Sequence, residues 1–377
     1  MKKLLKRRPK ITMEYTPIEK PTEGQTTDPK ADVPRETVSL KKTSFNELVE
    51  RAQEIADDCY DEVVSPSVFR DTVYSVNEGA MRMVNDEMLK QNTLTEYALG
   101  QLCNKLGIPS AYMQRCLNAG KTFYEDDEPN VFNALAVHNL STWTNQYKGS
   151  SVLVRNYQDK VRGVLSNRYS ICDTPTILDV IGDSLPVDDY KIKGYYLSPE
   201  RFHLRLVGDK LDIPNEDLFS GIQIDSSDVG RSTLVVHYMI YKQVCTNGLV
   251  VSRGDGILFK QKHLSIDPQT FKNGLSVALE NIPSLNKWSK TLIEEAMTKN
   301  EVNFDRISDD KMKDLIDKVK SLTSFDERTC KKTIELMKTK YTHNRWGMIN
   351  AITEMAQNYT LERRLDLEKV AGGLLIA

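Results

Sequence analysis

The sequence is poor in the features that define several large classes of protein. Among its 377 residues, no apolar run approaches the roughly 18 that a membrane-spanning helix needs, and polar sequence follows residues 1–9 where a secretory leader would have an apolar core. The six cysteines include no Cys-x-x-Cys pair, which argues against a disulfide scaffold or a zinc ribbon. We therefore expect a soluble protein that stays in the cytoplasm, contacts no membrane and keeps its cysteines reduced.

Motifs for catalysis are missing as well. The sequence contains no Gly-x-x-x-x-Gly-Lys-Ser/Thr phosphate loop, no Gly-x-Ser-x-Gly nucleophile turn and no His-Glu-x-x-His helix, and its five histidines show no metal-ligand spacing. A Cys245 nucleophile paired with His237 would require adjacent strands to bring the two together, and a buried turn cysteine is the commoner arrangement. We predict no catalytic residue, metal or cofactor; an enzyme with an unrecognised site is kept only as a third hypothesis.

Four regions of the chain differ in pattern. Residues 1–40 carry a basic cluster followed by polar sequence without apolar periodicity, which predicts a disordered tail. Residues 41–150 show the spacing of amphipathic helices and predict a helical lead-in. Residues 151–262 are β-rich, and residues 263–377 return to helical spacing. The expected fold class is α+β, with a mostly antiparallel central sheet between helical N-terminal and C-terminal regions.

Two helices are expected near the end of the lead-in. Thr93 and Glu96 form a capping box, and the turn at residues 107–109 separates this helix from the next one. A DNA-reading helix-turn-helix would have only Gln114 and Arg115 to contact bases. We therefore favour a helical hairpin in which Tyr112 and Met113 pack onto the sheet.

Strands dominate the central region. A hairpin is expected from residues 151–157 and 161–166, followed by a helix with Thr174 as its N-cap. Further strands are predicted at residues 190–197, 201–207, 221–226 and 231–244. Asn247 and Gly248 then predict a tight turn before residues 249–251.

Arginines and tyrosines gather in this β-rich region. In the strand near residue 201, alternation places apolar side chains on one face and basic ones on the other. The apolar set is Phe202, Leu204 and Leu206, and the basic set is Arg201, His203 and Arg205. Arginines that neutralise phosphates, beside tyrosines that stack on bases, favour single-strand binding. We predict such a surface from Arg155, Arg162, Arg168, Tyr169, Tyr195, Tyr196, Arg201, Arg205, Arg231 and Arg253. In the alternative interpretation, these arginines face solvent as partners of acidic side chains.

A helix is predicted at residues 345–357 in the C-terminal region. It should bury Trp346 and Ile349, while Gly347 allows close helix packing. Asn350 and Glu354 lie four residues apart and are expected to share a hydrogen bond.

Three separated segments carry a family resemblance. They are Val-Arg-Gly-Val-Leu-Ser-Asn-Arg-Tyr at residues 161–169, Val-Cys-Thr-Asn-Gly at 244–248 and Arg-Trp-Gly-Met-Ile-Asn-Ala-Ile-Thr-Glu at 345–354. In this order they resemble a phage and plasmid-like protein family whose shared domain is of unknown function, with the similarity running from about Leu94 to the C-terminus. The resemblance implies a protein of a mobile genetic element, in the cytoplasm of a host cell, and implies no reaction.

The leading hypothesis is a non-enzymatic nucleic-acid-binding protein of a phage or plasmid, which binds single strands in replication or recombination. The alternative is a protein-interaction factor that binds host or phage proteins, to redirect a host process or block a defence. The choice between DNA and RNA, and the binding of a second copy as a homo-oligomer, stay open at this point.

Overall fold

The structure is a computed structural model that describes residues 44–85, 91–122, 130–242, 247–250, 257–263, 267–298 and 309–376. The predicted tail at residues 1–40 lies outside these residues, as do Cys245 and Arg253. The α+β class with a mostly antiparallel arrangement of strands is confirmed. No helix in the described ranges is long and apolar enough to cross a membrane.

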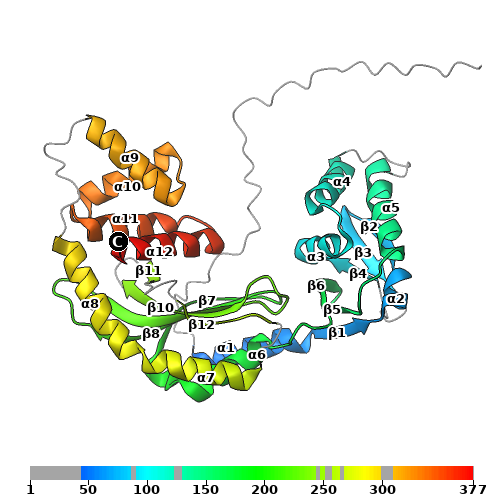
Figure 1. The fold of residues 1–377 in the computed structure, drawn as a ribbon, viewed down its shortest axis with the longest axis horizontal. Helices are drawn as coiled ribbons and strands as arrows, with labels where there is room; N and C mark the ends of the chain where they lie inside the picture. Colours follow the sequence, from blue (N-terminus) through cyan, green and yellow to red (C-terminus); the bar gives the residue numbers. More distant parts are fainter. Residues whose placement is uncertain are drawn as a thin grey trace, which may run out of the picture. The chain divides into compact units, whose positions relative to one another are not determined.

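The first half of the chain builds one six-stranded sheet with its second to fifth helices beside it, whereas its first helix packs with two helices that follow this sheet in the chain (Figure 1). Its elements are α1 (Phe45–Asp57), β1 (Cys59–Val64), α2 (Pro66–Arg70), β2 (Val73–Asn77), β3 (Ala80–Val84), β4 (Asn92–Leu94), α3 (Glu96–Leu106), α4 (Ser110–Thr122), α5 (Val131–Asn145), β5 (Val152–Tyr157) and β6 (Lys160–Ser166). The strand order is β1-β5-β6-β4-β3-β2, and of the pairs described in this sheet only β4–β6 is parallel. The helical lead-in predicted for residues 41–150 therefore also contains four strands, β1 to β4, which the sequence pattern did not predict.

The second sheet follows and is antiparallel throughout its described pairs. Its region contains α6 (Thr174–Ser184), a short 3-10 turn η1 (Val187–Asp189), β7 (Lys191–Leu197), β8 (Phe202–Leu211), β9 (Leu218–Ser226), β10 (Leu234–Lys242), β11 (Asn247–Val250) and β12 (Ile257–Gln261). The order is β11-β10-β9-β8-β7, and β12 pairs with β10. The strand β12 was not predicted from the sequence.

Helices form the remaining described part of the chain, as predicted. They are α7 (Pro268–Glu280), α8 (Ile282–Thr298), α9 (Asp309–Thr323), α10 (Glu327–Thr339), α11 (Arg345–Ala356) and α12 (Leu361–Ile376). The prediction for α11 is confirmed, because Trp346 and Ile349 are both buried. Gly347 is needed for a different reason than expected, since a Cβ there would lie 1.7 Å from the carbonyl oxygen of Thr342.

Three large apolar cores hold these elements, beside a small one formed by Val207, Met239 and Tyr241. One lies between the first sheet and α3, α4 and α5, and another joins one face of the second sheet to α1, α6 and α7. The third packs α8 to α12 together with parts of β8, β9 and β10. Phe202, Leu204 and Leu206 of β8 all enter the second of these cores, as their alternation predicted.

Several local predictions need correction. Thr95 caps α3, because its side chain accepts the amide hydrogen of Ala98, whereas Thr93 belongs to β4. Asp173 is the residue before α6, and Thr174 is already helical. Asn247 and Gly248 form no turn in the structure: they pair with Lys242 and Tyr241 as part of β11. In α11, Asn350 donates to the carbonyl of Trp346 instead of bonding to Glu354.

Candidate functional site

The predicted basic strand face is not a surface. Arg155 and Arg205 are 1% exposed and Arg162 is 2% exposed, so the prediction that these three side chains face solvent is wrong. Charged groups enter a protein interior when they find partners there, because desolvation of an unpaired charge is very unfavourable. Each of the three guanidinium groups lies within 4 Å of a carboxylate.

The other predicted site residues are scattered. Tyr195 is buried and its Oη accepts a hydrogen bond from Arg51, while Tyr196 and Tyr169 are half-buried. Arg201 lies 3.7 Å from Asp225. Arg168 and Arg231 are exposed, and the guanidinium of Arg231 lies over the ring of Tyr97 at 5.6 Å. No continuous basic surface therefore joins the predicted set among the described residues.

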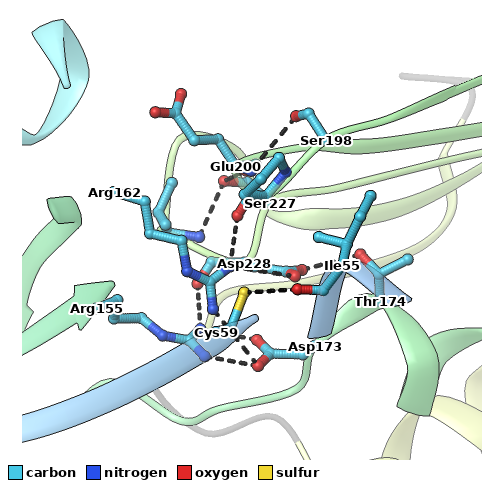
Figure 2. Close-up of polar contacts among 12 residues, drawn as sticks. Ile55, Cys59, Arg155, Arg162, Asp173, Thr174, Ser198, Glu200, Ser227 and Asp228 are labelled. Carbon is cyan, nitrogen blue, oxygen red and sulfur yellow. Dashed lines mark hydrogen bonds and ion pairs between the residues drawn. The ribbon is translucent and has the colours of Figure 1, made fainter. Parts of the chain in front are cut away.

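Five charged residues form a group that we call the Arg–Asp cluster: Arg155, Arg162, Asp61, Asp173 and Asp228. The two arginines and Asp228 are buried, whereas about a quarter of the Asp61 and Asp173 side chains is exposed. Most of it is visible in Figure 2. Arg155 donates to Asp173 at 2.7 and 2.6 Å and to Asp61 at 3.0 Å. Arg162 lies 3.6 Å from Asp228 and 3.9 Å from Asp173. The two arginines also donate to the carbonyl oxygens of Asp228 and Pro199 respectively.

Local structure explains how these side chains meet. Asp61 on β1 is directly opposite Arg155 on β5 in the antiparallel ladder, so the two form a cross-strand pair. Asp173 precedes α6, and it makes no capping bond with its side chain because both carboxylate oxygens bind Arg155. Thr174 donates to Asp228 at 3.0 Å. The cluster thus ties strands of the first sheet to the start of α6 and to the segment that follows β9.

The electrostatic state of the cluster follows from its composition, since three carboxylates share two guanidinium groups. Burial and the neighbouring Asp173 raise the pKa of Asp228 to about 7. Although burial acts in the opposite direction, the hydrogen bonds to Asp173 and Asp61 raise the pKa of Arg155. Burial also raises the pKa of the adjacent Cys59 thiol to about 11, so this thiol is protonated at neutral pH and is a poor nucleophile.

Two aromatic residues border the cluster. Tyr169 donates to the carbonyl oxygens of Ser227 and Asp228, and its ring stacks on His263 with centroids 5.2 Å apart. His263 is buried, and neither ring nitrogen has a hydrogen-bond partner among the residues that the structure describes. The described residues include no group of His, Cys, Asp or Glu side chains that fits a metal ion. Each described carboxylate of the cluster already binds a guanidinium group. We therefore interpret the cluster as a set of contacts that stabilises the fold.

A second buried polar group lies on the face of the second sheet opposite its apolar core. His203 on β8 contacts Asp225 on β9 through Nδ1 at 2.9 Å. Arg205 pairs with Glu368 of α12 at 2.5 Å, and Arg364 reaches the same carboxylate at 2.9 Å. Sequence reasoning found the basic half of this group but missed Glu368. The only local signal was its spacing of four residues from Arg364.

The exposed feature that sequence reasoning missed is a set of apolar side chains on two neighbouring helices. Tyr112 of α4 and Val131, Phe132, Leu135 and Trp143 of α5, which we call the apolar face, are between 39% and 75% exposed. Tyr112 was expected to pack onto the sheet, but only its neighbour Met113 does so. The available signal was that α5 contains no charged residue in 15 positions. A helix of this composition usually has both sides covered.

Comparisons with known proteins do not assign this chain to a family. No protein-family model, no curated protein and no solved structure matches the chain. The resemblance to the phage and plasmid-like family therefore stays a prediction.

Proposed function

We propose that this chain is a protein-interaction factor, and that it binds another protein through the apolar face on α4 and α5. One observation carries the proposal. Of the eleven large hydrophobic side chains that are exposed in the described parts of the chain, five belong to these two helices. Scattered exposed apolar residues are ordinary, whereas a concentration of them marks a binding surface.

The chemistry of the apolar face agrees with a protein interface. Interface centres are enriched in Trp, Tyr, Phe and Arg and contain few charged residues otherwise. Trp143, Phe132 and Tyr112 supply the aromatic side chains, and Arg115 lies one turn after Tyr112 on α4. Trp and Tyr are also the residues whose truncation most often weakens binding strongly.

The nucleic-acid hypothesis has lost the arrangement that favoured it. Its central arginines, Arg155, Arg162 and Arg205, are occupied by carboxylates inside the protein. Phosphate neutralisation needs cations that remain accessible. Nucleic-acid binding is one of the outcomes that the crosslinking experiment distinguishes. Redirection of a host process is one role that a protein-binding face would serve.

Site-specific photo-crosslinking in the natural host cell tests the proposal. The photoreactive amino acid p-benzoylphenylalanine replaces Phe132 in the full chain, and in a control chain it replaces Val277, which is 57% exposed on α7. We expect a discrete protein adduct from position 132 and none of the same mass from position 277. Purified partner should then bind Trp143→Ala at least about tenfold more weakly than the unchanged chain.

Three outcomes would overturn the proposal. They are equal adducts at both positions, no protein adduct at position 132, and an adduct that disappears on nuclease treatment. The last would restore the nucleic-acid hypothesis and place its site on α5.

A further inference from the structure

The turn between β9 and β10, residues 227–233, is held by side chains that come from the first sheet and its helices. Gln101 of α3 donates to the carbonyl oxygen of Val229 at 2.9 Å, and it accepts an amide hydrogen of β6 at the same distance. Arg155 of β5 donates to the carbonyl oxygen of Asp228. Backbone carbonyls do not titrate, so these hydrogen bonds are the same at every pH. The side chain of Asp228 adds a contact that does titrate.

The Arg–Asp cluster beside this turn holds more carboxylates than guanidinium groups. Arg155 and Arg162 supply two positive charges, and three aspartates can supply three negative ones. Both arginines are buried, and Asp228 is 6% exposed. With every carboxylate ionised, one negative charge would lack a counter-charge in a site that is largely closed to water. Such a charge is very unfavourable, so one carboxylate retains a proton.

The hydrogen bonds identify Asp228 as the carboxylate that retains the proton. The other two carboxylates each accept hydrogen bonds from the Arg155 guanidinium, at 2.6 to 3.0 Å, and each is about a quarter exposed. Asp228 accepts from the neutral hydroxyl of Thr174 at 3.0 Å. The guanidinium of Arg162 lies 3.6 Å from it, which is beyond hydrogen-bond distance. Asp228 therefore has the least compensation for a negative charge.

The other titratable groups around the cluster do not restore the balance. Three of them are neutral near pH 7: the Cys59 thiol, the Tyr169 phenol and the His263 imidazole. Burial raises the pKa of the thiol and of the phenol, and it lowers the pKa of the imidazole. On the neighbouring turn between β7 and β8, Glu200 lies 3.8 Å from Arg231, so these two charges compensate each other. The charge state of Asp228 thus depends on the cluster itself.

From this imbalance we infer that the β9–β10 turn detaches reversibly from the first sheet, and that ionisation of Asp228 favours the detached state. Detachment breaks the hydrogen bonds that Gln101 and Arg155 donate to the turn, while the ladder between β9 and β10 is retained. Water then solvates the Asp228 carboxylate, which removes the cost of its charge. This conformational change is independent of the partner that binds the apolar face.

The direction of the pH dependence follows from the two states. In the attached turn, burial and the neighbouring Asp173 raise the pKa of Asp228 to about 7. In the detached turn the carboxyl titrates like an exposed aspartate, near about 3.9. The detached fraction should therefore rise up to about tenfold per pH unit between these values and stay constant above about 7. Acid favours attachment, and neutral pH favours detachment.

Hydrogen-exchange mass spectrometry of the full chain tests the inference. Exchange rates are converted to protection factors, because chemical exchange itself depends on pH. Between about pH 5.5 and 6.5, protection of residues 227–233 and of the Val164 amide, which donates to Gln101, should fall about tenfold. Asp228→Asn keeps the shape without the charge and should abolish this change. The matched variant Asp183→Asn, at an exposed position of α6, should retain it.

Each other result overturns the inference. One is a protection factor of the turn that does not change with pH in the unchanged chain, and another is a change that persists in Asp228→Asn. A parallel change in α11 would show that the whole protein unfolds and that the turn does not detach by itself. If Asp228→Asn does not fold, the unchanged chain still decides, because protection of the turn must fall from about pH 5.5 to 6.5 and stay constant from about pH 7.5 to 8.5. A continued fall above pH 7.5 would contradict the assignment to Asp228.

Discussion

Arg155 on β5 holds Asp173 at the start of α6 through two parallel hydrogen bonds, from Nη1 to Oδ1 at 2.7 Å and from Nη2 to Oδ2 at 2.6 Å. This two-point geometry is specific to a guanidinium group and a carboxylate, and a lysine does not reproduce it. The bond joins a strand of the first sheet to a helix that packs under the second. A residue that the sequence suggested for ligand binding therefore contributes to the fold.

Removal of Arg155 should make the protein easier to unfold. Arg155→Met leaves Asp61 and Asp173 without their main partner, and such breaks in buried ion pairs typically lower the free energy of unfolding by about 3–5 kcal/mol. Arg168→Met, at an exposed position of the same region, should change it by less than about 0.5 kcal/mol. Urea unfolding at neutral pH measures both. Similar values for the two variants would show that Arg155 does not stabilise the fold.

Asp228 should make stability depend on pH. Its pKa is raised to about 7 by burial and by Asp173, whereas an unfolded aspartate titrates near about 3.9. Its contribution to stability is therefore full below the unfolded pKa and is lost as pH rises through about 7. Compared with Asp228→Asn, the unchanged protein should lose on the order of 1 kcal/mol per pH unit between these values. Parallel curves of unfolding free energy against pH for the two proteins would contradict this assignment.

His263 should contribute the opposite pH dependence. Burial lowers its pKa, so the unfolded chain takes up a proton first and stability falls as pH drops below about 6.5. His263→Phe keeps a ring to stack on Tyr169 and removes two nitrogens that have no partner in the described part of the chain. We expect unchanged or slightly higher stability at pH 7 and a smaller loss in acid, measured by thermal unfolding. A loss above about 2 kcal/mol would show that these nitrogens bind something the fold requires.

The two tryptophans Trp346 and Trp143 should respond in opposite ways to truncation. Trp346 is 3% exposed, and its Nε1 donates to Glu216 at 2.7 Å. Trp346→Ala should therefore lower the free energy of unfolding by about 3–5 kcal/mol. Trp143→Ala should change it by less than about 0.5 kcal/mol, since half of that side chain faces water. Chemical unfolding of both variants checks the pair, and a large loss from Trp143→Ala would remove the apolar face from consideration as a binding surface.

Local sequence patterns predicted the helices and strands better than they predicted what packs against each side chain. The hairpin of β5 and β6, the apolar side of β8 and the burial of Trp346 were all visible from spacing and turn residues. The strands β1 to β4 were missed because they are short, between three and six residues, and lie among stronger helical signals. The candidate site was predicted least well. A basic side chain on an alternating strand has the same local pattern whether water or a carboxylate covers it.

The sequence by itself determined which side chains of β8 are apolar and that α5 carries no charge, because both depend on spacing and composition within a few turns or residues. Only the tertiary structure decided what covers the other side of each element. The partners of the buried arginines are far away in the chain: Asp61 is 94 residues from Arg155, and Glu368 is 163 residues from Arg205. The same holds for α5, whose Phe132 and Trp143 stay exposed because the described helices and strands pack against its opposite side.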